Sequence, residues 1–296
     1  MNIKDFRTEV ITYIEENYED VNALNCDMVK NNSVKLCGIT IKQREGIVFP
    51  TIYLEPYLEQ YINGTPLETI VKNIMEQSEN AKIDDSIDID FFSNYERVKD
   101  KLYAKIINTN KNSELLNEIP HKHFLDLSIV VYCDMSEIIG VNATVLVRNE
   151  HVDKWGVMKD KVIEDAYENT RNREVIVKDI MEIVGAYAEC VEKEDQETMF
   201  SSNGNMLVMT NDKMSFGAIG MTFDDKLDEF CCKKHKGIYI IPSSIHEVIL
   251  VPDNERIDEE WLNNIIKEVN KTSLSKEEVL SENAYYYSAY DGYSIV

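Results

Sequence analysis

The sequence has no long hydrophobic run and few basic residues. No stretch reaches the roughly 20 apolar residues that span a bilayer, so we predict a protein that does not cross a membrane. Residues 1–9 lack the apolar segment of a secretory signal. The chain has only 31 Lys and Arg but 54 Asp and Glu, which gives a formal net charge of −23. This shortage of cations argues against direct nucleic-acid binding, which needs them on phosphates, and against docking on anionic lipid.

Patterns that mark common sites are also missing. The six cysteines include no Cys-x-x-Cys spacing, so we expect reduced thiols and a cytoplasmic protein rather than a disulfide framework. The 11 glycines form no phosphate-binding loop and no dinucleotide-binding fingerprint, and no Gly-x-Ser-x-Gly elbow is present. The sequence therefore predicts no bound cofactor.

The remaining composition is that of a folded, globular chain. Of the 296 residues, 44% are hydrophobic and 29% are charged. This length suits one large domain or two modest ones. The polar, asparagine-rich stretch at residues 108–118 is the best boundary candidate. We therefore predict an N-terminal lobe over residues 1–112 and a C-terminal lobe over residues 113–296.

Hydrophobic periodicity predicts an α+β fold with antiparallel or mixed sheets, helices packed on one face, and two lobes. Apolar residues at helical spacing predict helices over residues 4–18, 95–106 and 259–270. In the last of these helices we expect the apolar residues to face inward: Trp261, Leu262, Ile265, Ile266 and Val269.

β-branched runs predict strands. Residues 21–29 and 34–41 fit a hairpin, and residues 216–221 fit a further strand. Gly217 and Gly220 in that strand indicate that something approaches its backbone closely. A pocket for a small ligand is one explanation, and ordinary close packing is the other.

The most apolar stretch of this acidic chain is residues 237–252. Two β-branched runs flank a break that starts at Pro242, and Pro252 ends the second run. This pattern predicts two antiparallel strands joined by a tight turn. The runs are nearly continuous rather than alternating, so we expect the hairpin to be central in a sheet and covered on both faces.

Polar chemistry gathers at the turn of this hairpin, in Ser243, Ser244, His246 and Glu247. A hydroxyl, an imidazole and a carboxylate are what an acyl-transfer site needs. However, turn serines usually bond nearby backbone groups, and neighbours such as His246 and Glu247 point to opposite faces of a strand. A turn-and-cap role is the main interpretation, and a catalytic role is the alternative.

A second candidate is the pair His121 and His123. Two residues apart on a strand, both imidazoles lie on one face. Such a pair holds zinc if a third ligand arrives from elsewhere, and we consider His246, Asp126 and Glu247 for that role. The alternative is two surface histidines without a ligand.

Several strings together resemble a known family. The string IPSSIHEVILVP at residues 241–252 is the most specific, and supporting strings lie at residues 119–127, 206–211 and 279–285. They resemble a domain-of-unknown-function family of anaerobic Gram-positive bacteria, often associated with mobile elements. The resemblance implies a cytoplasmic bacterial protein, and it implies no established activity.

Three functional hypotheses remain. The first is a non-enzymatic, acidic protein that acts by protein–protein binding or regulation on a basic partner. A nucleic-acid mimic of a mobile element is a narrower form of this hypothesis. The second is a hydrolase or metal-assisted enzyme that uses the Ser243–Glu247 turn and the His121/His123 pair. The third is a small-ligand sensor.

Overall fold

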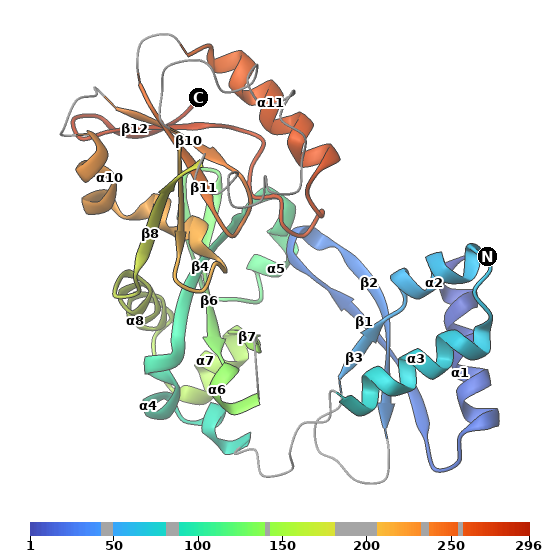
Figure 1. Ribbon diagram of the computed structural model, residues 1–296. Coiled ribbons are helices and arrows are strands. Elements are labelled where there is room, and N and C mark those ends of the chain that lie inside the picture. Colours follow the sequence, from blue (N-terminus) through green and yellow to red (C-terminus); the bar gives the residue numbers. More distant parts are fainter. Residues whose placement is uncertain (43–49, 81–88, 140–142, 181–205, 232–236, 254–256) are drawn as a thin grey trace. The chain divides into compact units, whose positions relative to one another are not determined.

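The computed structural model of the chain describes residues 1–42, 50–80, 89–139, 143–180, 206–231, 237–253 and 257–296. Its strands form three antiparallel sheets and its helices pack against them, so the predicted α+β class is confirmed (Figure 1). Contacts divide the chain into two compact units: unit 1 is Met1–Asp90 with Met135–Ala143, and unit 2 is Phe91–Asp134 with Thr144–Val296. Among the described residues, no helix has the length and apolarity to cross a bilayer.

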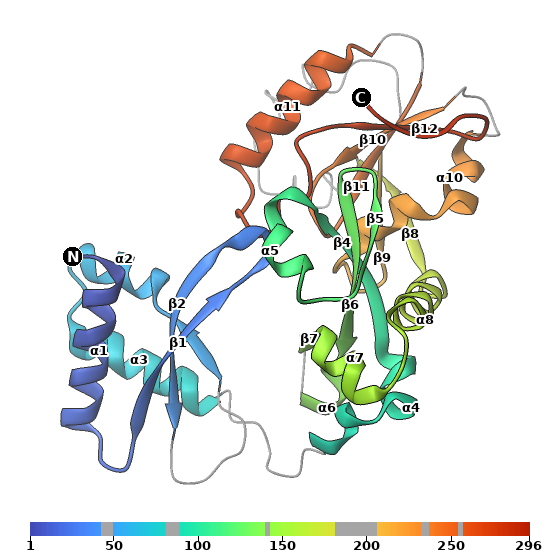
Figure 2. The same ribbon diagram turned by 180° about the vertical axis from the view of Figure 1, so that it is seen from behind.

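Unit 1 is a small sheet covered by helices. Its elements are α1 (Ile3–Asn17), β1 (Asn22–Val29), β2 (Lys35–Lys42), β3 (Thr51–Tyr53), α2 (Glu55–Ile62), α3 (Leu67–Asn80) and α6 (Ser136–Ile139). The sheet order is β1-β2-β3, and the hairpin predicted over residues 21–29 and 34–41 is confirmed as β1 and β2. Figures 1 and 2 show α1 and α3 on the same side of this sheet. Their fully buried residues, such as Phe6 and Ile70, meet Ile39 and Ile41 there.

Unit 2 contains the other two sheets. Its first half comprises α4 (Tyr95–Val98), β4 (Leu102–Asn108), α5 (Ser113–Leu116), β5 (His121–Phe124), β6 (Leu127–Asp134), β7 (Thr144–Leu146), α7 (Asn149–Trp155) and α8 (Lys159–Arg171). Its second half comprises β8 (Val175–Asp179), β9 (Leu207–Asn211), the 3₁₀ helix η7 (Gly217–Thr222), α10 (Asp224–Cys231), β10 (Ile238–Pro242), β11 (Val248–Pro252), α11 (Glu259–Thr272), β12 (Tyr285–Ser288) and β13 (Gly292–Ile295).

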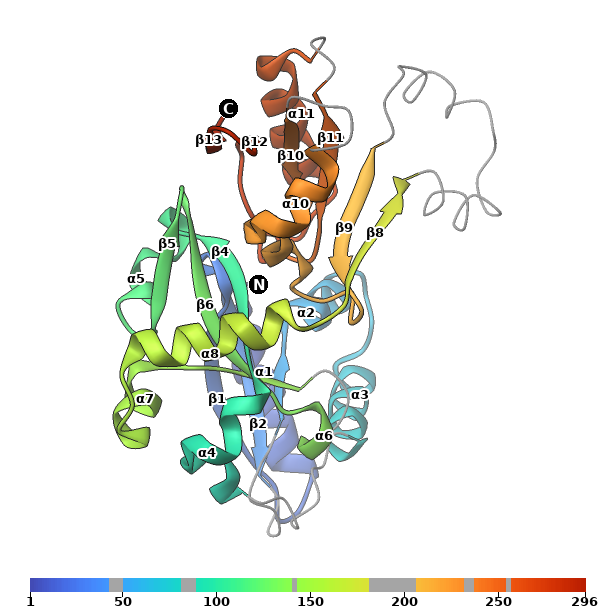
Figure 3. The same ribbon diagram turned by 90° about the vertical axis from the view of Figure 1, so that its left-hand side faces the viewer.

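The two sheets of unit 2 share one core. The smaller sheet has the order β4-β6-β5, with β7 also paired to β6, and the larger has the order β13-β12-β10-β11-β9-β8. Ala104 and Ile106 of β4 belong to the same buried cluster as Ile240 of β10. Figure 3 shows α8 lying across β4 and β6, and the Thr170 hydroxyl accepts a hydrogen bond from the Ala104 amide at 2.7 Å.

The β10–β11 hairpin lies in the middle of the larger sheet, as its sequence predicts. Its pairing runs from Ile238 opposite Pro252 to Pro242 opposite Val248. Alternate residues enter different cores: Ile240 faces the cluster shared with the smaller sheet, while Tyr239 belongs to a cluster with Leu262 and Ile266 of α11. Both faces of the hairpin are therefore covered.

Two predicted elements are wrong. The helix expected over residues 95–106 ends at Val98, and residues from Leu102 onward form β4, which pairs with β6 along its length. A spacing of four, as from Leu102 to Ile106, is compatible with a helix and also with one face of a strand. The strand expected over residues 216–221 is instead η7, which follows Phe216 with its positive φ of 57°.

A buried tyrosine joins the smaller sheet to the C-terminal strands. The Tyr285 side chain is fully buried, and its hydroxyl donates to Asp126 Oδ1 at 2.7 Å. Asp126 Oδ2 also accepts from Ser281 Oγ at 3.2 Å and Asn283 Nδ2 at 3.1 Å. Burial, and then the Asp126 carboxylate, raise the pKa of Tyr285, so its hydroxyl stays a neutral donor.

Tyr285→Phe is expected to lower the free energy of unfolding of unit 2 by about 1.5–3 kcal/mol, because a buried hydrogen bond to a charged acceptor is lost. Both tryptophans of the chain, Trp155 and Trp261, lie in unit 2, so urea unfolding followed by tryptophan fluorescence measures this unit. Tyr290→Phe is the control, since Tyr290 is 95% exposed. Equal stability of the two variants would contradict the role of Tyr285.

Candidate functional site

The turn between β10 and β11 is held by its own polar groups. Ser243 Oγ donates to Glu247 Oε1 at 3.1 Å, and the Ser244 amide donates to the Glu247 carbonyl at 3.1 Å. The Ser244 hydroxyl accepts from the His246 amide at 3.0 Å. These bonds give both serines the local role typical of turn residues.

The His246 side chain is directed at other parts of unit 2. Its Nδ1 accepts the Phe216 amide proton at 3.1 Å, and the two rings stack at 5.5 Å with an angle of 20°. Its Nε2 lies 3.8 Å from Glu278 Oε1. Within the described part of the chain, no hydrogen bond joins this imidazole to the hydroxyl of Ser243 or Ser244. The catalytic interpretation of the turn stays a prediction, without support from this geometry.

Around Phe216 lies a group of cations and aromatic rings, which we call the cation–aromatic cluster: Tyr103, Lys105, Tyr132, Arg173, Phe216 and His246. The Lys105 ammonium lies 4.3 Å from the Phe216 ring centroid, and the Arg173 guanidinium lies 3.3 Å from that of Tyr103. Arg173 also donates to Tyr132 Oη at 3.2 Å and Asp134 Oδ2 at 3.0 Å. Cation–π contacts and a paired carboxylate thus stabilise the cluster from within.

Sequence reasoning missed this cluster. Tyr103, Tyr132, Arg173 and Phe216 are each separated by tens of residues in the chain and form no local motif. Only the pairing of β4 with β6 brings Tyr103 opposite Tyr132. No local signal in the sequence identifies the cluster, because it depends on the strand β4. The sequence instead predicts a helix over residues 95–106, where β4 begins.

Burial lowers the pKa of His246, and Lys105 acts in the same direction, against the carboxylates of Glu278 and Glu247. The hydrogen bond from the Phe216 amide agrees with this direction, because only an unprotonated Nδ1 can accept it. The native protein therefore holds this imidazole in its neutral form.

The histidine pair lies where the sequence places it. His121 and His123 are on β5, with ring centroids 5.1 Å apart and the rings at 80° to each other, so their predicted shared face is confirmed. Asp126 is occupied with Ser281, Asn283 and Tyr285. Over the described residues, no group of three or more His, Cys, Asp or Glu side chains is placed to hold a metal ion.

The close approaches at Gly217 and Gly220 come from the chain itself. A Cβ at Gly217 would lie 2.7 Å from the His246 carbonyl oxygen and 2.8 Å from the Asn211 amide nitrogen. At Gly220 it would lie 3.0 Å from Met209 Sδ. Packing of η7 against β9 and the hairpin turn accounts for both glycines, without a ligand.

Helix α11 is firmly attached to the larger sheet. The Asp258 side chain caps it by accepting the amides of Glu260 and Trp261 at 3.0 and 3.1 Å. Its own residues Leu262 and Ile266 are buried on the side that faces the sheet. Asn263 fixes it further, because its Nδ2 donates to the Val296 carbonyl at 2.8 Å and its Oδ1 accepts the Ala284 amide at 2.7 Å.

The outer edge of α11 carries an apolar stripe, which we define as Trp261, Ile265 and Val269. Their spacing of four places them in one row on the helix. Trp261 is 55% exposed and Val269 is 40% exposed. The prediction that both face inward is therefore wrong. The sheet covers only the part of the helix surface that carries Leu262 and Ile266. The apolar face of the helix is wider than this covered part.

The sequence model described as a family of unknown function, DUF5688, matches residues 3–289 of the 296. The chain belongs to DUF5688. No curated protein and no solved structure matches it. The resemblance to a family of unknown function is confirmed, while the bacterial source and the link to mobile elements stay predictions.

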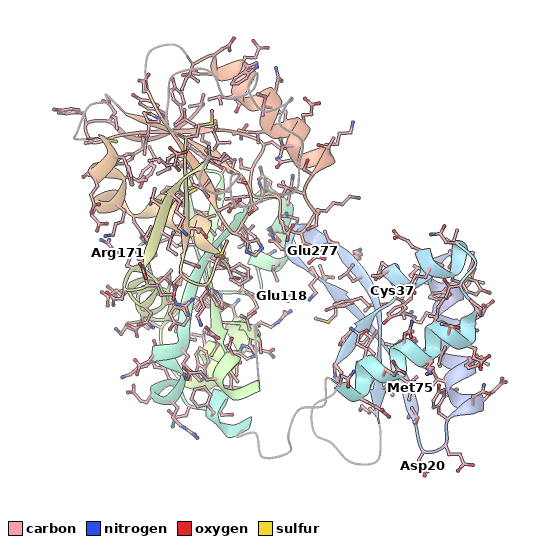
Figure 4. The ribbon with its side chains drawn as sticks, in the orientation of Figure 1. Asp20, Cys37, Met75, Glu118, Arg171 and Glu277 are labelled. Carbon is pink, nitrogen blue, oxygen red and sulfur yellow. The ribbon has the colours of Figure 1, made fainter. Side chains whose placement is uncertain are left out.

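In unit 1 of the DUF5688 chain, a surface hollow of about 590 Å³ lies at the end of α1. Its lining is Glu15, Glu16, Asn17, Tyr18, Glu19, Asp20, Val21 and Asn22. Asp20 stands at the turn between α1 and β1 (Figure 4). None of the candidate residues from the sequence lines this hollow, and an open acidic surface offers a ligand little apolar area.

For the DUF5688 chain, the neutral state of His246 predicts a pH dependence of stability. The unfolded chain takes up a proton on His246 near its ordinary pKa of about 6.5, before the native state does. The stabilisation is therefore present above about pH 6.5 and is lost as pH falls through the lower native pKa. His246→Asn keeps a hydrogen-bond acceptor but cannot titrate, so its stability should decline less between about pH 7.5 and 5.

Urea unfolding at a series of pH values measures this difference. An equal loss of stability in wild type and His246→Asn as the pH falls would contradict a native state that disfavours the protonated ring. A pKa above about 6.5 for the His246 ring in the folded protein, measured by NMR, would contradict it as well.

Proposed function

We propose that the chain is a non-enzymatic binding protein that acts through protein–protein contacts, with the α11 stripe as its contact surface. The exposed Trp261 carries this proposal. Tryptophan is the residue type most enriched among those that dominate binding energy at interfaces. A 55% exposed tryptophan in a row with Ile265 and the exposed Val269 is therefore the best candidate anchor in unit 2.

The attachment of α11 supports the same role. The Asp258 cap, the two bonds of Asn263 and the buried Leu262 and Ile266 hold the helix before any partner arrives. A partner would meet a preformed surface, and little conformational entropy would be lost on binding. This is the arrangement of a helix face that docks in a groove.

Charge favours a basic protein as the partner. Exposed carboxylates outnumber exposed cations on α11. Asp258, Glu259 and Glu260 lie at its start and Glu268 lies beside Val269, against Lys267 and Lys271. A second copy of this chain would bring another −23 charges to the contact, and like charges disfavour association. Mimicry of nucleic acid is a narrower form of the proposal, in which the partner's basic surface also binds DNA or RNA.

Trp261→Ala is expected to weaken binding of this partner about 30-fold or more, since the loss of an interface anchor costs about 2 kcal/mol or more. The measurement is affinity capture from the source organism with the intact chain, eluted along a salt gradient and quantified by mass spectrometry. Tyr290→Ala is the matched control, because it removes an exposed aromatic ring elsewhere in unit 2.

A basic protein retained by wild type and Tyr290→Ala, lost by Trp261→Ala and released by rising salt is the expected result. Equal recovery with all three proteins would overturn the assignment of the α11 stripe.

A further inference from the structure

The two histidines of β5 lie next to each other on one face of the strand. β5 is an edge strand of the smaller sheet, and its register places His121 opposite Val130 and His123 opposite Ser128 of β6. His121 is partly exposed and His123 is exposed. An ion from solvent can therefore reach both rings.

A hydrogen bond at Nδ1 orients each ring. The Ile119 carbonyl lies 3.1 Å from His121 Nδ1, and a carbonyl can only accept, so the proton is on Nδ1 and the Nε2 lone pair is available. His123 Nδ1 lies 3.4 Å from Ser128 Oγ, which is itself 2.8 Å from Thr109 Oγ1. Imidazoles that bind metals through Nε2 usually have such a partner on the other nitrogen.

The separation of the rings fits a shared ion. When two Nε2 atoms bind one ion at about 2.0–2.1 Å with a near-tetrahedral angle, the ring centroids lie about 5 Å apart. The observed separation is 5.1 Å. The two rings are therefore already at the separation that one shared ion requires.

We propose that His121 and His123 form a two-histidine site for a transition-metal cation of the Zn²⁺ class, to which neutral imidazole is a well-suited ligand. Because no third such ligand is at hand within the described residues, water or a donor from another molecule completes the coordination. The strongly negative chain attracts the cation. This site is independent of the α11 stripe and of the proposed protein partner.

The test uses the intact chain, with Zn²⁺ as the probe, at about pH 7.5. Excess Mg²⁺ occupies surface carboxylates, which it prefers to imidazole. The sequence has five histidines, so NMR of the imidazole nitrogens resolves each ring. The rings of His121 and His123 should shift together and saturate at one ion per chain.

Variants separate a shared ion from two independent ones. His121→Asn should weaken the Zn²⁺ response of His123 at least tenfold, and His123→Asn should do the same to His121, because each removes half of the pair. Ser128→Ala keeps both ligands and should weaken binding about tenfold by releasing the His123 ring. Lys122→Ala, whose exposed side chain points to the opposite face of β5, should bind as wild type.

Three results would overturn the proposal. They are unchanged rings of His121 and His123 at millimolar Zn²⁺, a response of one ring that survives replacement of the other, and undiminished binding by the double variant. Circular dichroism of each variant establishes that it is folded before the titration is interpreted.

Discussion

The burial of the β10–β11 hairpin on both faces is the constraint on which unit 2 depends. One face receives α11 through Leu262 and Ile266, and the other receives η7 and the smaller sheet through Met221 and Ile106. The α11 stripe and the cation–aromatic cluster therefore both depend on the hairpin: the stripe lies above one face, and Phe216 and His246 of the cluster are positioned on the other. A change that disturbs the hairpin is expected to disturb both.

Tyrosine hydroxyls replace scarce cations as partners for carboxylates in this acidic chain. Beside the Tyr285–Asp126 bond, the C-terminal strands donate from Tyr286 to Asp253 at 3.0 Å, from Tyr287 to Asp228 at 2.8 Å and from Tyr293 to Asp224 at 2.6 Å. Burial and the Asp253 carboxylate raise the pKa of Tyr286 to about 12. Since neutral hydroxyls compensate no charge, these bonds fix the strands and leave the negative charge of the surface intact, which suits a basic partner.

Local patterns in the sequence predicted the parts of the fold that are stabilised locally. The β1–β2 and β10–β11 hairpins are examples, because strand propensity and turn residues lie within one short stretch of each. β4 was missed because its apolar residues satisfy two periods, and only the distant β6 decides between them. η7 was missed because its run of buried residues reflects packing against β9, not strand pairing.

The candidate surfaces also differ in how much of each the sequence predicts. The shared face of His121 and His123 follows from their spacing alone. The exposure of Trp261 does not, because an amphipathic pattern gives the direction of the apolar face and not the width that a neighbour covers. The cation–aromatic cluster requires the pairing of β4 with β6 and the turn at Phe216, which no local signal contains.

Site-specific photo-crosslinking in the source organism tests the central claim most directly. A photoreactive phenylalanine analogue replaces Asn264, an exposed α11 residue one turn from Trp261 toward the C-terminus, or replaces the exposed Tyr290 as a reference. The account predicts a discrete adduct with a basic protein from position 264, none from position 290, and loss of the adduct when Trp261→Ala is added. The same adducts from both positions, or an adduct that persists without Trp261, would contradict a contact surface on α11.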